Sequence, residues 1–299
     1  MRRMESLISL SNSIADIVDA VAPSVVQVQG RRRPASGLVC GDGAVLTLAS
    51  VLGRNDGLHV RTHDGHALDA QLAGWDPATS LAVLQVDGLK APALSPSSVA
   101  PRVGHIAIAV ARSWSNVVTA TSGLVSIIGG PLRTWRRTSI EQIIRTSAPM
   151  HDGFAGGAFL DASGTLIGVT TASAIRGLGI VIPASIAWQT AAALRQHGHV
   201  KRGYLGIASQ PVRIADPVQA GANTDALLVT HVTPGSPAEG AGVLVGDVIL
   251  EVDGRRVESP EDLLDLLTGD RIGTAVALQL RRGGAPVTVT ITIGERLNS

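Results

Sequence analysis

Between residues 24 and 182 the chain consists of short apolar runs, each followed closely by glycine, aspartate or proline. Short runs at close spacing, with turn residues between them, are typical of β-strands in a barrel or a sandwich. The clearest runs are residues 25–28, 37–40, 45–48, 81–86, 106–110 and 166–169. We therefore predict that this stretch of the chain is all-β.

A helix is predicted on each side of the strands. Residues 7–21 carry apolar side chains at helical spacing, and Pro23 ends the segment because a proline disfavours helix in the residue before it. Residues 184–197 form the second predicted helix. Its expected apolar side consists of Ile186, Ala187, Thr190, Ala191 and Leu194.

A second unit is expected to begin near Gly203. It contains apolar strands at residues 227–232, 246–252, 275–281 and 286–293, with turn residues between them. Ser259-Pro260-Glu261-Asp262 predicts a helix start, since serine is a favoured N-cap and proline is favoured in the first turn. Leu263, Leu266 and Leu267 give this helix an apolar face.

Composition excludes several classes of protein. The hydrophobic share is 45% but the aromatic share only 2%, so the cores are expected to be aliphatic. With a net charge of +1 and only short basic clusters at residues 31–33 and 136–137, we predict no nucleic-acid partner. The single cysteine, Cys40, excludes an internal disulfide. No apolar run is long enough for a signal core or a membrane span, so we predict a cytoplasmic protein, exported only if the N-terminus is incomplete.

The motif Gly153-Phe154-Ala155-Gly156-Gly157, with the short strand that follows it, resembles the nucleophile turn of HtrA/Deg serine proteases, where the turn is Gly-Asn-Ser-Gly-Gly. Residues 41–47 resemble the strand before the family's catalytic histidine, and residues 76–84 the segment that carries its aspartate. The unit after Gly203 resembles a PDZ domain. The resemblance implies a mainly β fold: an N-terminal helix in residues 1–22, a trypsin-like double β-barrel in 23–198 with its barrels meeting near 111–115, and a PDZ domain, a small α+β sandwich, in 203–295.

The resemblance places the three triad positions on Ser50 for the histidine, Ser80 for the aspartate and Ala155 for the serine. A methyl group cannot be a nucleophile, and a serine hydroxyl cannot act as a general base near neutral pH. Ser80 carries no charge with which to orient a base. We therefore predict that the chain is not an enzyme but an inactive homologue of a serine endopeptidase.

The oxyanion hole of the family uses backbone N–H groups, which here belong to Gly153 and Ala155. Neither requires a particular side chain, so the hole is able to survive without the triad. However, Phe154 replaces a polar residue of the motif, and residues 173–177 replace a longer loop that helps form the family's specificity pocket. A barrel that serves only as a scaffold is the alternative.

Two further possibilities involve histidines. Ser50 or Ser80 would be a displaced nucleophile if His151, or a histidine of the predicted hairpin His63-Asp64-Gly65-His66, served as its base. His63 and His66 could also ligate a metal together with His59 or Asp69. Most metal sites, however, have ligands at more favourable sequence spacing than these residues have. We expect these histidines to lie on surface turns and strands, and we expect no metal and no cofactor.

In the PDZ unit, Tyr204-Leu205-Gly206-Ile207 matches the family's carboxylate-binding loop. Its backbone N–H groups would receive a peptide C-terminus, and the strand that follows would add the peptide as an extra strand. Lys201 and Arg202, just before the loop, would assist a carboxylate. The alternative is that residues 204–207 form only a core strand.

We therefore predict a catalytically inactive HtrA/Deg-like protein that binds C-terminal or unfolded peptide segments through its PDZ domain, as an adaptor, chaperone or regulator. The alternatives are an active serine-type endopeptidase with a displaced catalytic group, and a non-catalytic subunit of a mixed protease oligomer. The expected partners are polypeptide C-termini or unfolded protein, and a second copy of the chain or an active family protease is a further candidate. Family trimers use aromatic residues near the N-terminus, and this chain has none before Trp75.

Overall fold

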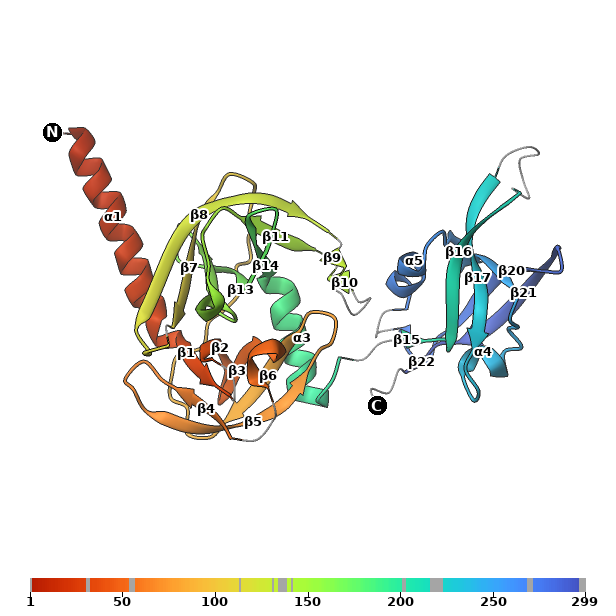
Figure 1. Ribbon diagram of the computed structural model, residues 1–299, viewed down its shortest axis with the longest axis horizontal. Helices are drawn as coiled ribbons and strands as arrows, with labels where there is room; N and C mark the ends of the chain where they lie inside the picture. Colours follow the sequence, from red (N-terminus) through yellow and green to blue (C-terminus); the bar gives the residue numbers. More distant parts are fainter. Residues whose placement is uncertain are drawn as a thin grey trace. The chain divides into compact units, whose positions relative to one another are not determined.

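The computed structural model describes residues 2–30, 33–53, 57–112, 114–130, 132–133, 139–140, 142–200, 203–215, 223–267 and 271–295. The chain forms two compact units, residues 1–200 and 201–299 (Figure 1). Strands dominate both units. The mainly β fold predicted from the sequence, with two closed barrels followed by a smaller unit, is confirmed.

The first barrel closes in the strand order β1-β2-β3-β6-β5-β4, all antiparallel. Its interior is aliphatic and includes Val26, Val45, Val60 and Leu84. The strands are β1 (Val25–Gln29), β2 (Ala35–Gly41), β3 (Ala44–Leu48), β4 (Leu58–Arg61), β5 (Ala67–Trp75) and β6 (Leu81–Val86).

The second barrel closes in the order β11-β14-β13-β12-β7-β8. Its interior contains Phe154 and Phe159 beside small and aliphatic side chains, so the expectation of purely aliphatic cores is wrong here. The strands are β7 (Ile106–Arg112), β8 (Val118–Gly129), β11 (Ile143–Thr146), β12 (Ala158–Asp161), β13 (Leu166–Ile175) and β14 (Leu178–Pro183), and β9 (Leu132–Arg133) pairs separately with β10 (Ser139–Ile140).

The connection between β13 and β14 is a two-residue hairpin turn. Ile175 pairs with Leu178, and the residues between them, Arg176 and Gly177, both have positive φ, at 51° and 79°. Positive φ at both central residues is the type I′ geometry that suits the strand twist. The segment that the sequence marked as short is therefore a minimal turn.

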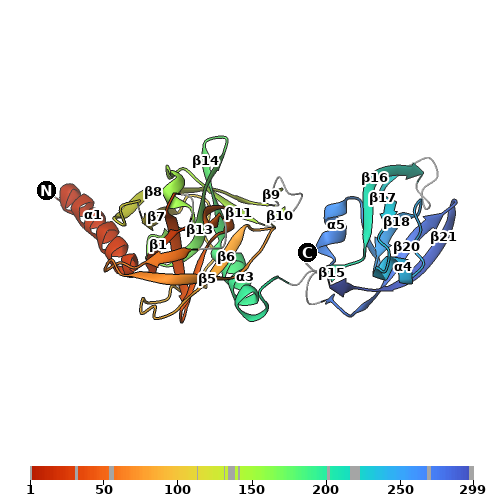
Figure 2. The same cartoon turned by 60° about the horizontal axis from the view of Figure 1, so that its bottom comes forward.

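Helices cover the barrels. α3 (Ala184–His197) matches the predicted range and packs against β5, β6, β13 and β14 (Figure 2). It places Ala187, Ala191 and Leu194 in a core shared with residues of both barrels. α1 (Arg2–Val21) begins before residues 7–21, whose apolar spacing predicted a helix, and Ile14, Ile17 and Val18 in its C-terminal half pack against this core. Within the described residues, no helix is long and apolar enough to cross a membrane.

The C-terminal unit contains a sheet in the order β16-β17-β18-β20-β21 and a separate β15–β22 pair. Ser259 caps α5 as predicted, and its hydroxyl and the Asp262 carboxylate bond each other's backbone N–H in a capping box. The elements of this unit are β15 (Gly203–Tyr204), β16 (Ile207–Ala215), β17 (Asn223–Val232), α4 (Pro237–Gly240), β18 (Val248–Val252), β19 (Arg255–Arg256), α5 (Pro260–Asp265), β20 (Ala275–Arg282), β21 (Ala285–Thr292) and β22 (Gly294–Glu295).

The first unit also contains the short helices η1 (Ala22–Ser24), α2 (Ala49–Leu52) and η2 (Asp152–Phe154).

Candidate functional site

The segment around Ala155 is a tight turn that leads from η2 into β12. Gly156 has φ +80°, which favours glycine. A Cβ on Gly156 would lie 2.2 Å from the carbonyl oxygen of Ser36, so the glycine is also needed for space. Thr170 holds the turn from β13: its N–H donates to the Gly157 carbonyl, and its hydroxyl donates to the Phe154 carbonyl. The sequence motif therefore corresponds to a packed, hydrogen-bonded turn.

The two N–H groups expected to line an oxyanion hole both donate within the turn. Gly153 N–H donates to Nδ1 of His151 at 3.0 Å, and Ala155 N–H donates to the carbonyl of Asp152 at 3.1 Å. An oxyanion hole requires donors that point at a common vacant position. In this conformation the N–H groups of Gly153 and Ala155 bond the chain itself.

Phe154 lies inside the second barrel, where it is 2% exposed. Its ring meets the His151 imidazole edge-on, with centroids 5.0 Å apart. The aromatic residue of the motif thus contributes to the barrel core. Its position fixes His151 beside the turn.

Ser50 lies in α2, the single helical turn that follows β3, and its side chain is exposed. Ser80 lies directly before β6 and is half-buried, with φ +58°. A non-glycine residue with positive φ is uncommon, and such residues concentrate at functional sites. Buried Asp76 supports this backbone, since its carboxylate accepts the N–H and the hydroxyl of Thr79 at 2.9 Å and 2.8 Å.

Hydrogen bonds connect the segments that carry positions 50, 80 and 155. Ala49 N–H donates to the Ser80 carbonyl at 2.7 Å, which joins α2 to the loop before β6. Thr47 donates its hydroxyl to the Ser36 carbonyl at 2.7 Å, and Ser36 N–H donates to the Ala155 carbonyl at 2.9 Å. The first barrel is thereby bonded to the turn of the second.

Ser36 and Arg112 are site residues that the sequence did not indicate. Ser36 is fully buried; its hydroxyl donates to the Gly153 carbonyl at 2.8 Å and accepts Arg112 N–H at 2.9 Å. The Arg112 side chain is also buried, and burial lowers the pKa of its guanidinium. The guanidinium donates to the carbonyls of Ala22, Val25 and Asn116. Apart from the bond to Asn116, these bonds join residues at least 76 positions apart, so no local pattern in the sequence marks them.

Each histidine of the first barrel contacts a different partner, so the three do not converge on one point. Nδ1 of His63 lies 2.6 Å from the Arg112 guanidinium, whereas His66 pairs with Asp64 at 2.8 Å and His59 with Asp69 at 2.9 Å. The predicted hairpin turn is present, closed by Thr62 N–H on the His66 carbonyl. In the part of the chain that the structure describes, no three metal-ligating side chains gather at one point.

In the C-terminal unit, Gly206 has φ +87°, and a Cβ there would lie 2.1 Å from Cβ of Ser236. Carbonyls of the loop bond inward: Leu205 accepts Ala238 N–H, and Gly206 accepts Thr233 N–H. No acceptor among the described residues takes the N–H groups of Leu205 and Gly206. Tyr204 ends β15 and Ile207 begins β16, while Lys201 and Arg202 lie outside the described residues.

β16 is an edge strand, paired only with β17 within the described sheet. α5 packs beside β16, and the apolar side chains of Leu205, Leu263 and Leu267 belong to one buried cluster that Ile207 adjoins. A strand edge with no partner in the described part of the unit, next to an apolar helix face and a loop whose N–H groups have no described acceptor, has the chemistry that receives a peptide as an added strand.

Two family models match the chain: a trypsin-like peptidase domain over residues 35–169 and a PDZ domain over residues 203–293. Over 274 residues the chain is 34% identical to the "Probable periplasmic serine endoprotease DegP-like" of Halomonas elongata, covering 89% of this chain and 57% of that protein. Over 268 residues it is 34% identical to the "Periplasmic pH-dependent serine endoprotease DegQ" of Escherichia coli, covering 86% of this chain and 58% of that protein. The chain thus spans little more than half the length of these relatives.

Solved structures match nearly the whole chain. The serine endoprotease from Yersinia pestis superimposes with a TM-score of 0.78 at 30% identity, covering 95% of this chain and 98% of that one. The HtrA-type protease AlgW with a decapeptide gives a TM-score of 0.80 at 27% identity, covering 96% and 99%.

These similarities overturn two predictions. The prediction that the chain is not an enzyme is contradicted, because the relatives are named serine endoproteases, which points to an enzyme. The prediction of a cytoplasmic protein is contradicted as well, because the relatives are named periplasmic, which suggests export. The resemblance to HtrA/Deg proteases, from which the first of these predictions was drawn, is itself confirmed.

Proposed function

Because this chain belongs to the HtrA/Deg family of trypsin-like proteases with a PDZ domain, we propose that it binds polypeptides by their C-termini through the PDZ unit. The terminal carboxylate accepts the N–H groups of Leu205 and Gly206, and the peptide pairs with the open edge of β16. The observation that carries this proposal is that the N–H groups of Leu205 and Gly206 have no acceptor among the described residues and lie beside an edge strand of the described sheet. The peptide-bound state of the HtrA-type protease AlgW supports it.

A peptide titration tests the proposal. A fluorescent peptide with a free C-terminus and apolar terminal residues is expected to bind, and its C-terminal amide to bind at least about tenfold more weakly, since the amide loses the charge-assisted hydrogen bonds. Gly206→Ala is expected to abolish binding because of its contact with Ser236. Gly235→Ala is the matched control: Gly235 also has positive φ, but its Cβ would meet nothing within 4 Å. Equal binding of acid and amide contradicts the proposal.

Peptide hydrolysis is the second candidate function, favoured by the names of the relatives. Residue 155 is alanine, so peptide hydrolysis by this chain would require a displaced hydroxyl as nucleophile, with Ser50 and Ser80 as the candidates and a histidine as the base. The exposure of Ser50 and the positive φ of Ser80 support these two positions.

Unfolded casein and a fluorophosphonate probe test this candidate. Cleavage of casein, together with a label mapped to Ser50 or Ser80 by mass spectrometry, supports it, and alanine variants of each serine identify the one that reacts. A chain that neither cleaves casein nor takes up the probe contradicts it.

We also propose that positions 50, 80 and 155 correspond to the histidine, aspartate and serine of the family's triad. The hydrogen bonds that connect their segments support this correspondence. The triple variant Ser50→His, Ser80→Asp, Ala155→Ser is expected to gain fluorophosphonate labelling at residue 155. Aspartate tolerates the positive φ of position 80. The single variant Ala155→Ser is the control; a triple variant that labels no more than this control contradicts the alignment.

The relatives also support an exported location for this chain. Fractionation of cells that express a C-terminally tagged chain tests this. Tagged protein found only in the cytoplasm would contradict export.

A further inference from the structure

Pro211 lies in β16, the edge strand that the proposed peptide ligand joins as an added strand (Figure 1). Its side chain is exposed. Proline has no N–H, so in a sheet it is confined to edge strands, with its nitrogen turned away from the neighbouring strand. The orientation of Pro211 therefore decides how far a peptide can continue along this edge.

The hydrogen bonds of β17 show which side of β16 Pro211 faces. Val229 N–H donates to the Asp247 carbonyl at 2.8 Å, and the Val229 carbonyl accepts an N–H from the same segment, just before β18. Successive residues of a strand direct their main-chain groups to opposite sides, so Leu228 faces β16, where it pairs with Gln210. Gln210 in turn faces β17, and Pro211 faces the open edge.

The start of β16 has the same orientation. The Gly206 carbonyl accepts Thr233 N–H at 2.8 Å, so Gly206 directs its carbonyl toward β17. The register shift in this strand pair leaves the extra residue, Thr230, on β17, so the alternation along β16 is not interrupted. The residues of β16 whose main-chain groups face the open edge are therefore Ile207, Ser209 and Pro211.

A peptide whose carboxylate is held at Leu205 and Gly206 runs antiparallel to β16, because its C-terminus lies at the start of that strand. Its last residue then lies opposite Ile207, the third from its end opposite Ser209, and the fifth from its end opposite Pro211. Ser209 presents both an N–H and a carbonyl to the peptide, whereas Pro211 presents only a carbonyl. The proline ring also fills the space where a donor hydrogen would lie. The carbonyl of the fifth peptide residue thus has no donor.

We propose that Pro211 ends the added strand, so that the PDZ unit recognises about the last four residues of its ligand. This inference rests on the proposed function, since the same loop and strand edge bind the peptide. Four extended residues span about 13 Å. A folded partner therefore needs to expose only a short C-terminal tail, and residues further upstream in a long unfolded chain add no affinity at this edge.

Fluorescence anisotropy on the full chain tests this limit with two peptides that have free C-termini. They are Ser-Val-Thr-Leu and Ser-Thr-Gln-Thr-Ser-Val-Thr-Leu, each labelled at the N-terminus with fluorescein through an aminohexanoyl spacer. The parent chain is expected to bind the two with dissociation constants within about twofold of each other. The C-terminal amide of the octapeptide measures binding elsewhere on the chain, which is subtracted.

Pro211→Ala supplies the missing donor and removes the ring. This variant is expected to bind the octapeptide about fivefold more tightly than the parent chain does, the effect of one net hydrogen bond, and to bind the tetrapeptide equally well. Pro286→Ala is the matched control, because Pro286 is also exposed on an edge strand, β21, at the opposite edge of the sheet. The control is expected to change the binding of neither peptide.

Two results overturn the proposal. One is octapeptide binding by the parent chain that exceeds tetrapeptide binding by more than about twofold. The other is the same length dependence in Pro211→Ala as in the parent chain. The parent chain alone supplies the first reading if the variant does not fold. A gain with length contradicts only the four-residue limit, whereas failure of both free-acid peptides to bind contradicts the proposed function and the limit with it.

Discussion

Arg112 is a buried cation whose described partners are carbonyl oxygens and an imidazole nitrogen rather than a carboxylate. It bonds the carbonyls of Ala22 and Val25, at the start of the first barrel, to the end of β7. Its planar fork reaches several acceptors at once, which a lysine ammonium cannot reproduce. Arg112 therefore joins the chain after α1 to the wall of the second barrel.

Replacing Arg112 tests this role. Arg112→Met is expected to lower the free energy of unfolding of the first unit by about 3 kcal/mol, because buried carbonyls lose their donors. Arg112→Lys is expected to recover less than half of the loss. Urea denaturation measures both, and Arg102→Met is the control on an exposed arginine, expected within about 0.5 kcal/mol of the parent chain. A parent-like midpoint for Arg112→Met would refute the role.

Cys40 illustrates burial acting on a single titratable group. Desolvation raises the pKa of its thiol to about 11, and the thiol donates to the Ala44 carbonyl. Because only the thiolate is nucleophilic, native Cys40 is expected to react with iodoacetamide at about pH 8 roughly 100-fold more slowly than the unfolded chain. Labelling followed by mass spectrometry, with and without urea, measures the ratio. Equal rates would contradict the raised pKa.

At the scale of elements, the turn 153–157 depends on contacts that cross between barrels. Gly156 faces the Ser36 carbonyl and the Thr47 hydroxyl from the first barrel, while Thr170 bonds the turn from the second. The turn is thus fixed by two strands of one barrel and one of the other. This packing accounts for its glycines without any reference to catalysis.

Gly156→Ala is expected to prevent stable folding of the first unit, since the new Cβ would lie 2.2 Å from a backbone oxygen. Gly177→Ala is the matched control: its φ is +79°, close to that of Gly156, but a Cβ there meets nothing within 4 Å. The control is expected to cost only the backbone strain, about 1–2 kcal/mol. Circular dichroism and thermal melting compare the two, and similar melting temperatures would show that the contact is unimportant.

At the scale of the whole molecule, the chain contains two compact units with separate cores. In the second unit, the buried carboxylate of Asp247 stabilises the local structure. It is 1% exposed and accepts two hydrogen bonds from Arg282, at 2.8 Å each, and one from Leu244 N–H. The bonds from Arg282 are the largest cause that holds the pKa of Asp247 below its usual value.

Two thermal transitions are therefore expected by calorimetry, and acid is expected to act on one of them through Asp247. A carboxyl whose folded pKa is depressed stabilises the fold above its unfolded pKa, about 3.9, and loses this contribution as the pH falls through the folded pKa. At neutral pH, Asp247→Asn should lower the free energy of unfolding of the PDZ unit alone, by about 2–4 kcal/mol. It should also make the stability of that unit less sensitive to acid below about pH 4. Asp225→Asn, at an exposed ion pair, is the control. An equal shift of both transitions would contradict independent units.

The sequence by itself determined the features that depend on neighbours along the chain. The capping box of Ser259 and Asp262, the range of α3 and the turn at residues 63–66 follow from local preferences for caps, periodicity and positive φ. The motifs also identified the family, because spacing within a motif is a local property. Alanine at position 155, where the family has serine, did not decide whether the chain is an enzyme. The prediction of no enzyme activity that we drew from it is contradicted by the names of the relatives.

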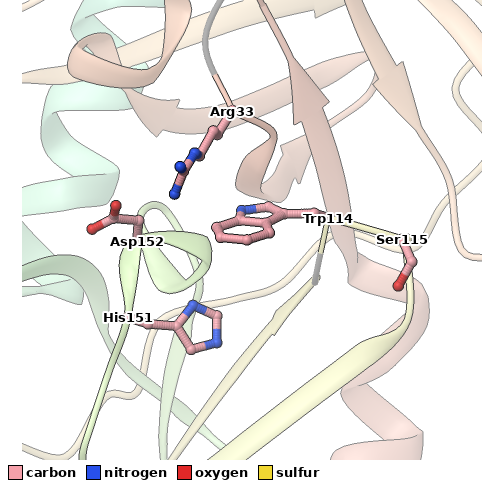
Figure 3. A pocket seen from close by; sticks show the side chains of 5 residues that line it. All are labelled: Arg33, Trp114, Ser115, His151 and Asp152. Carbon is pink, nitrogen blue, oxygen red and sulfur yellow. The ribbon is translucent and has the colours of Figure 1, made fainter.

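Only the tertiary structure decided how distant groups pair. Arg112 bonds a carbonyl 90 positions away, and the Ser36 hydroxyl bonds one 117 positions away, so neither pairing leaves a local pattern in the sequence. A cavity of about 740 Å³ likewise forms where three separate connections meet (Figure 3). Its lining residues are Arg33, Trp114, Ser115, His151 and Asp152. Such features depend on how the barrels close and pack, and on nothing that adjacent residues encode.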